Sequence, residues 1–272
     1  MKLPSPTWFV GCGNMAGAMV KGWQAAGVDL SMATAIRPSG TPVEGVRTVS
    51  ALKDAGAAPR MILLGFKPQS LDDVAPELAP WITSKTIVIS LLAGVEGQSL
   101  RRRFSKGLIV RAIPNLPVAV RRGVVALHAE NDLEEAVHKQ LSELFAALGF
   151  ALWVESEAIL SAIGALAGAG PAYVARFVDA LARAGARQGL PEGIAATIAL
   201  ETVFGTAWMA ASTGESMDEL ARRVASPKGT TEAGLAVLDR EGAFQELIAA
   251  TIDAARRRGA ELAAKARGEQ VA

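Results

Sequence analysis

Residues 7–16 read Thr-Trp-Phe-Val-Gly-Cys-Gly-Asn-Met-Ala, and the fold follows from this stretch. Thr7–Val10 is typical of a short buried strand, and the apolar pattern after it predicts a helix over Ala16–Ala26. Between them, Gly11 makes a tight turn, Gly13 lets a phosphate approach the backbone, and the small residue three positions on allows close packing. The helix start adds N–H donors for that phosphate. Unless the turn is purely structural, it is a dinucleotide-binding turn made of Gly11, Gly13, Asn14, Met15 and Ala16.

The alternation of strand and helix patterns continues to about Val154. Further strands are expected at Ser31–Ile36, Met61–Phe66, Thr86–Ser90, Leu108–Ile113, Gly123–Leu127 and Ala151–Val154. The clearest helices are expected at Ala16–Ala26, Ser70–Leu78 and Leu133–Leu148. This alternation is typical of a mostly parallel sheet with helices on both faces, as in a Rossmann-like α/β domain.

From about Glu157 the strand signals stop and helical patterns fill the chain. Helices are expected at 157–188, with irregularity around Gly168–Pro171, and at 191–213, 216–224 and 230–266. We therefore expect an NAD(P)-binding α/β domain over residues 1–156 and an all-α domain over residues 157–272. The helices are apolar on several faces, and Gly164–Gly168 has the small-x-x-x-small spacing of closely packed helices. Unless that motif packs inside one subunit, the all-α domain mediates dimerisation, in a homodimer or a larger homo-oligomer.

The composition excludes several classes of protein. The 272 residues include 28 Lys and Arg against 27 Asp and Glu, and the net charge of +1 excludes a strongly basic nucleic-acid footprint. The single cysteine, Cys12, excludes an internal disulfide and fits a reducing compartment, so a cytoplasmic protein is expected. With only two histidines beside it, no metal site is expected.

The longest uncharged run, Ala158–Ala175, has eighteen residues, which is barely enough to cross a bilayer. It is poor in large apolar side chains and is interrupted by Pro171 and several glycines. We interpret it as a buried helix of a soluble protein with no membrane partner.

The end of the second expected strand indicates which nicotinamide cofactor binds. NAD sites place an acid there for the ribose 2′-hydroxyl, whereas NADP sites use an arginine. Here the strand ends in Ile36-Arg37-Pro38-Ser39, and no acid follows until Glu44. Unless Arg37 is only a solvated loop residue, the pattern favours NADPH, with NADH possible.

Three further loops follow strands at the edge where open α/β sheets bind ligands. They contain Lys67-Pro68, Ala93-Gly94 and Asn115, which stands between two prolines that stiffen its loop. Lys67 has an equally good explanation as a solvated charge at a strand end.

One turn in the helical half also has the features of an anion site. Ser226-Pro-Lys-Gly-Thr-Thr231 carries hydroxyls and a glycine directly before a helix, an arrangement suited to a carboxylate. Helix capping by Thr230 or Thr231 explains the same residues equally well.

Taken in order, these motifs resemble the pyrroline-5-carboxylate reductases from about Trp8 to Ala249. The matching elements are Gly-x-Gly-x-Met-Ala, Lys-Pro-Gln, Ala-Gly-Val, Pro-Asn-x-Pro, Gly-Pro-Ala-Tyr and Ser-Pro-x-Gly-Thr-Thr-x-Ala-Gly-Leu. The last is highly specific, while the first is shared with most Rossmann enzymes. The resemblance implies NAD(P)H-dependent reduction of (S)-1-pyrroline-5-carboxylate to L-proline, the last step of proline biosynthesis. It also implies an interlocked dimer and an active site between the domains.

The resemblance assigns roles to individual residues. It places the cofactor phosphates on Gly11–Ala16, the 2′-phosphate near Arg37, and the nicotinamide loops on Lys67, Pro68, Ala93, Gly94 and Asn115. It places the substrate carboxylate on Ser226, Gly229, Thr230 and Thr231. The Thr231 hydroxyl would meet the ring nitrogen, which makes Thr231 the expected catalytic residue.

The chain departs from the family pattern at four positions. Leu116 stands where threonine is usual, and Lys228 replaces a glycine of the last motif. Ala167 and Ala169 stand where serines are usual. These changes leave other cyclic imines, such as pyrroline-2- or piperideine-carboxylate, as alternative substrates. A non-catalytic NADP(H)-binding regulator is the less favoured alternative, because a sensor has no use for a carboxylate cradle.

Two absences support imine reduction over related chemistries. Residues 157–272 contain no histidine, so a histidine relay for hydroxy acids is not available there. The segment 158–189 contains no lysine, which argues against the related 3-hydroxyacid dehydrogenases. A cyclic imine is readily protonated and accepts hydride without a strong general acid.

Overall fold

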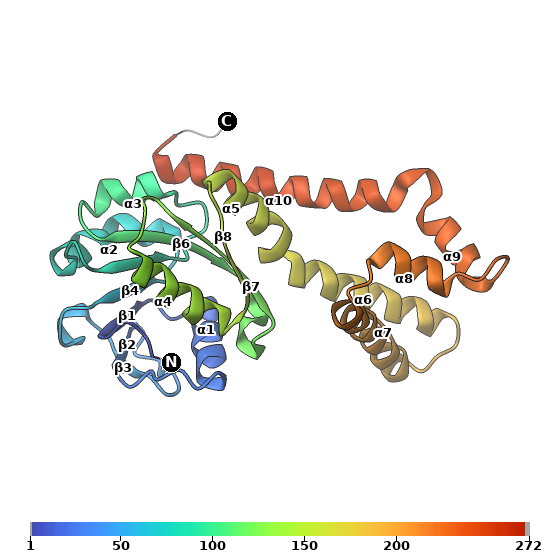
Figure 1. The fold of residues 1–272 in the computed structure, drawn as a ribbon, viewed down its shortest axis with the longest axis horizontal. Coiled ribbons are helices and arrows are strands. Elements are labelled where there is room, and N and C mark those ends of the chain that lie inside the picture. Colours follow the sequence, from blue (N-terminus) through green and yellow to red (C-terminus); the bar gives the residue numbers. More distant parts are fainter. Residues whose placement is uncertain (1, 270–272) are drawn as a thin grey trace. The chain divides into compact units, whose positions relative to one another are not determined.

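The computed structural model describes residues 2–269, and these fall into two compact units. The first comprises the described residues up to Ala169 together with those from Ala255 onward, and the second is Gly170–Ala254. Helix α10 (Ala243–Arg267), red in Figure 1, begins in the second unit and ends in the first.

An eight-stranded sheet forms the centre of the first unit (Figure 1). The strand order is β3-β2-β1-β4-β5-β6-β7-β8, and all neighbours are parallel except β6 and β7. The strands are β1 (Thr7–Val10), β2 (Ala33–Ile36), β3 (Arg47–Val49), β4 (Met61–Leu64), β5 (Ile87–Ser90), β6 (Leu108–Pro114), β7 (Gly123–Ala129) and β8 (Gly149–Trp153). The expected mostly parallel sheet is confirmed.

Helices of the first unit cover both faces of this sheet. They are α1 (Asn14–Ala25), α2 (Leu71–Leu78), α3 (Gly97–Arg103), α4 (Glu135–Ala146) and α5 (Glu157–Ile163), with the short helix η4 (Leu116–Val120). Alternate residues of β1 face opposite ways. Phe9 packs with Trp23 of α1 and Phe145 of α4, whereas Trp8 belongs to the cluster that contains α2 and α3 side chains. Because both faces are covered, the strands are continuous apolar runs, which made them recognisable in the sequence.

The second unit consists of helices. They are α6 (Gly170–Arg187), α7 (Glu192–Thr213), α8 (Met217–Val224), α9 (Thr230–Leu238) and the first part of α10. Within Gly170–Ala254, a range described throughout, the buried side chains are Ala195, Ala199 and Leu220. Large apolar side chains such as Phe204, Trp208 and Leu247 are more than half exposed. The single chain therefore leaves this unit almost without a core.

The structure corrects four expectations about elements. The edge strand β3 and the short helix α3 were not expected, because one is three residues long and the other ends in three arginines. The expected helix over 230–266 is two helices, since Glu241 and Gly242 adopt positive φ angles of 53° and 71°. The expected irregularity at Gly168–Pro171 begins earlier, as a π-helix over Gly164–Gly168.

The interpretation of Ala158–Ala175 as a buried helix is wrong for the single chain. Of this run, only Leu160 and Ala165 are buried among the described residues. By length and composition, Glu157–Arg187 and Glu192–Thr213 would both suffice to cross a membrane, although core helices of soluble proteins pass the same test. Within one chain, the apolar faces of these helices are not covered by other elements.

Helix α1 approaches η4 so closely that one of its glycines has no room for a side chain. A Cβ on Gly22 would lie 2.1 Å from the carbonyl oxygen of Val118, whereas a Cβ on Gly17 of the same helix would meet nothing within 4 Å. We expect Gly22→Ala to lower the free energy of unfolding by about 1–3 kcal/mol through overpacking. Gly17→Ala is the matched control and should raise it by about 0.5–1 kcal/mol through helix propensity. Urea unfolding at one protein concentration measures both, and equal effects would contradict this account.

Candidate active site

The predicted dinucleotide turn lies at the carboxyl end of β1. Because β2 and β4 flank β1, this end is a switch point of the sheet, where ligands of such folds bind. Gly11 has a φ of 75°, and a Cβ there would lie 2.8 Å from the backbone nitrogen of Phe66. Only glycine fits this position without strain, as expected for the first glycine of the motif.

The start of α1 offers hydrogen-bond donors to an anion. Gly13 is the N-cap, and a Cβ there would meet nothing within 4 Å, so its backbone faces open space. In the described part of the chain, the N–H groups of Asn14, Met15 and Ala16 have no acceptor. Together with the helix dipole, these donors suit a phosphate group.

A cavity of about 600 Å³ adjoins the turn, within the size range of small-molecule sites. Gly13 and Asn14 line it, together with Arg37 from the loop after β2 and Leu116 from η4. Glu44, the first acid after β2, lies in the same wall. Lys21 of α1 also lines it, although its sequence context gave no signal for a site.

The loop after β2 gathers a guanidinium and two hydroxyls. Arg37 Nη1 donates to the carbonyl oxygen of Thr41 at 2.9 Å, and the hydroxyls of Ser39 and Thr41 lie 2.9 Å apart. The other two guanidinium nitrogens of Arg37 have no hydrogen-bond acceptor among residues 2–269. The loop therefore holds Arg37 in place and leaves donors for a phosphate.

Cys12 lies inside the turn but is buried. Burial raises the pKa of its thiol to about 11, against the opposing effect of the Arg37 charge. The thiol is therefore protonated at neutral pH and acts as a small packing group rather than a nucleophile.

The other predicted cofactor residues lie at the ends of neighbouring strands. Lys67 is exposed three residues after the end of β4, at the N-cap position of a short 3-10 helix that begins at Pro68. Ala93 is exposed after β5, and Gly94 has a φ of 73°. The parallel pairing of β4 and β5 brings these two loops to one edge of the sheet.

Asn115 is buried, and protein backbone engages both ends of its side chain. Its Oδ1 accepts from the Val124 N–H at 2.8 Å, and its Nδ2 donates to the carbonyl oxygen of Ala167 at 3.1 Å. The side chain thus ties β7 to the π-helix. Because Ala167 contributes a carbonyl oxygen here, the loss of a serine hydroxyl leaves this bond intact.

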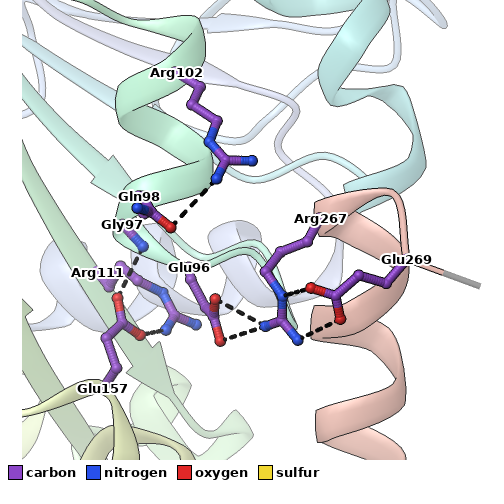
Figure 2. A network of polar contacts seen from close by, with 8 residues as sticks. All are labelled: Glu96, Gly97, Gln98, Arg102, Arg111, Glu157, Arg267 and Glu269. Atoms are coloured by element: carbon purple, nitrogen blue, oxygen red, sulfur yellow. Dashed lines mark hydrogen bonds and ion pairs between the residues drawn. The ribbon is translucent and has the colours of Figure 1, made fainter. Parts of the chain in front are cut away.

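An ion-pair network next to the β5 loop contains residues that the sequence did not indicate as functional (Figure 2). Arg111 of β6 is only 5% exposed and pairs with Glu157, the first residue of α5. A second Glu157 oxygen accepts from the Gly97 N–H at 2.8 Å. The position of Arg111 within an apolar strand could have predicted an ion pair from the sequence, because a buried charge requires a partner.

In the second unit, Ser226–Thr231 comprises the end of the connection between α8 and α9 and the first two residues of α9. The N-cap of α9 is Gly229, without a side-chain cap, so Thr230 and Thr231 do not cap the helix. In the described residues, their hydroxyls and that of Ser226 have no hydrogen-bond partner. Lys228 has a φ of 57°, a conformation that favours glycine, and its N–H donates to Glu232 Oε2 at 2.6 Å. The loop therefore presents unengaged hydroxyls beside a helix start.

Two family models match this sequence. The model for pyrroline-5-carboxylate reductase dimerisation matches residues 157–262, and the model for coenzyme F420-dependent NADP oxidoreductases matches residues 8–94. The two matches fall on the helical half and on the start of the sheet.

Named relatives match over nearly the whole chain. A pyrroline-5-carboxylate reductase of Pseudomonas aeruginosa is 34% identical over 94% of this chain and 96% of its own. The structure of a pyrroline-5-carboxylate reductase from Coxiella burnetii is 32% identical, with a TM-score of 0.86 over 96% of this chain and 99% of its own. A Plasmodium falciparum pyrroline carboxylate reductase solved with NADP bound reaches the same TM-score at 23% identity, over 95% and 98% of the two chains. That last likeness supports the fold alone.

The geometry of the β2 loop predicts how Arg37 contributes to cofactor choice. We expect Arg37→Ala to raise the KM for NADPH by about 10- to 100-fold, the value of one charge-assisted contact of about 1.5–3 kcal/mol, and to leave NADH nearly unaffected. Arg60→Ala is the matched control, because Arg60 is exposed and precedes β4 at the opposite edge of the sheet. Equal losses with both cofactors in steady-state kinetics would show that Arg37 does not bind the 2′-phosphate.

Proposed function

Because the chain belongs to the pyrroline-5-carboxylate reductase family, we propose that it reduces (S)-1-pyrroline-5-carboxylate to L-proline with NADPH. The observation that carries this proposal is the 34% identity over 94% of the chain, since it spans the cofactor half and the helical half together. A resemblance confined to the first half would indicate only a dinucleotide-binding enzyme.

The residues at the switch point fit an NADP molecule. Gly11 and Gly13 leave the backbone open to a pyrophosphate, and the free N–H groups of α1 suit its charge. Arg37 shares the adjoining cavity, where it would hold the 2′-phosphate. When bound, the reduced nicotinamide supplies hydride. We assign its neighbouring loops to Lys67 and Pro68 after β4 and to Ala93 and Gly94 after β5. We assign Asn115 to the same side of the site.

The helical half supplies the groups proposed to hold the substrate. Ser226, Gly229 and Thr230 would bind the carboxylate, with the free amides at the start of α9 as further donors. Thr231 is the next residue, and we propose that its hydroxyl forms a hydrogen bond with the ring nitrogen of the substrate. The protonated imine gains hydride at carbon, and its nitrogen becomes a neutral amine that accepts this hydrogen bond. Catalysis then depends on position and hydrogen bonding rather than on a strong acid.

The helical region also makes the protein a homo-oligomer. The match to the dimerisation family covers residues 157–262, where the single chain exposes large apolar side chains. A second copy that covers these faces explains why α7 is apolar nearly all round. We propose a homodimer as the smallest unit. The single unpaired Cys12 suits a reducing compartment, and we propose a cytoplasmic location.

Steady-state kinetics test the proposed activity directly. We expect the highest kcat/KM for pyrroline-5-carboxylate with NADPH, compared with pyrroline-2-carboxylate, piperideine-carboxylate and NADH. A preference for another ring would show that Leu116, Lys228 and the alanines at 167 and 169 have changed the substrate. If none of the three imines is reduced, the proposed activity is wrong, and a regulator that only binds NADP(H) becomes the better explanation of the family resemblance.

The unengaged hydroxyl of Thr231 predicts a kinetic effect without a loss of stability. We expect Thr231→Ala to lower kcat by roughly 30- to 1,000-fold, the value of about 2–4 kcal/mol for one positioned hydrogen bond. Its unfolding free energy should stay within about 0.5 kcal/mol, because the hydroxyl caps no helix. Thr231→Ser is the control and should retain most activity. If kcat holds in Thr231→Ala while stability falls, the catalytic assignment is wrong.

A further inference from the structure

The two ends of the helical region contact a short loop of the first unit and the residue that directly follows this loop. This loop, residues 91–96, joins β5 to α3 and carries Ala93 and Gly94. The dimerisation match begins at Glu157 and ends at Leu262. Glu157 accepts from the Gly97 N–H, directly after the loop, and Leu262 lies against Gly94. All of these residues belong to the first compact unit.

The end of α10 packs so closely on Gly94 that a side chain at this position would clash with the α10 backbone. A Cβ on Gly94 would lie 2.8 Å from Leu262 Cβ and 3.0 Å from the backbone nitrogen of Ala263. One turn later, Ala266 packs against the core cluster on the α2 and α3 face. The last turns of α10 are therefore docked on the sheet unit, and the β5 loop lies under them.

An ion pair closes this contact (Figure 2). Arg267 Nη1 donates to both carboxylate oxygens of Glu96, at 2.9 and 3.0 Å. Glu269 accepts from Nε and Nη2 of the same guanidinium, at 2.6 and 2.9 Å. The Glu96 side chain does not cap α3, and both of its carboxylate oxygens accept from Arg267. Two hydrogen bonds thus join the Arg267 guanidinium to Glu96 of the β5 loop, and two more hold it against Glu269.

We propose that Arg267 is a positioning residue, which acts through Glu96 to hold the β5 loop where Ala93 and Gly94 meet the nicotinamide. This inference rests on the proposed function, because it takes the β5 loop as part of the cofactor site. The two side chains are about one-third exposed, and partly exposed ion pairs contribute little to stability. A small displacement of a group beside the reacting atoms costs far more in rate. The pair should therefore affect kinetics rather than folding.

The test compares Arg267→Ala, Glu96→Gln and the double variant with Arg258→Ala. Arg258 is the matched control, because it is an exposed arginine of α10 whose partner is Glu261 of the same helix. We expect each single variant to lower kcat/KM for NADPH by roughly 10- to 100-fold. The double variant should lose no more than either single variant, because both act through one pair. Arg258→Ala should have the same kcat/KM for NADPH as the unmodified protein.

Binding measurements separate positioning from general damage. The fragment 2′,5′-ADP carries the adenosine and the 2′-phosphate but no nicotinamide, so its affinity should stay unchanged in all variants. Hydrogen exchange at residues 91–96 of the free protein should be faster in Arg267→Ala and Glu96→Gln, a readout that needs no turnover. Parallel loss of 2′,5′-ADP binding, unchanged exchange, or additive losses in the double variant would overturn the proposal. If the unmodified protein reduces none of the imines, the proposed function fails, and the exchange result still decides whether Arg267 holds the loop.

Discussion

Strand β1 pairs in parallel with β2 on one side and β4 on the other, and the site depends on this arrangement. The chain leaves β1 toward one half of the sheet and enters β4 in the other half, so the loops diverge at their carboxyl ends. At that point the backbones almost touch, since a Cβ on Gly65 would lie 2.4 Å from the Gly11 carbonyl oxygen. Glycine at both positions allows this close approach, and α1 then begins at Asn14, which lines the adjoining cavity together with Gly13.

The helical half follows a different constraint. Its helices have apolar faces that one chain does not cover, and the buried side chains of Gly170–Ala254 are small or few. Oligomerisation through this region covers apolar surface that one chain leaves exposed, and burial of apolar surface is the main favourable term in folding and association. Assembly is therefore part of the fold of this region, and the Ser226–Thr231 loop is carried by helices that need a partner.

The sequence predicted the residues of the cofactor turn because that signal is local. A strand, two glycines and a helix start lie within ten residues, and each has a separate physical reason. Capping of α9 was ambiguous, because Thr230 and Thr231 suit a cap by residue type while the observed cap is Gly229. The split of residues 230–266 into two helices was missed because the polar stretch Asp239-Arg240-Glu241-Gly242 also suits one exposed helical turn, in which a single glycine is tolerated.

By itself, the sequence determined the order of most strands and helices, apart from β3, α3 and the break between α9 and α10, together with the mostly parallel sheet and the chemistry of the dinucleotide turn. These features depend on residues close together in the chain, where periodicity and glycine positions carry the information. Only the tertiary structure decided which charges meet. Arg111 finds Glu157 across 46 positions and Arg267 finds Glu96 across 171, because strand register and helix docking bring them together. A guanidinium and a carboxylate carry no local mark of their partner, so these contacts exist only once the elements have packed.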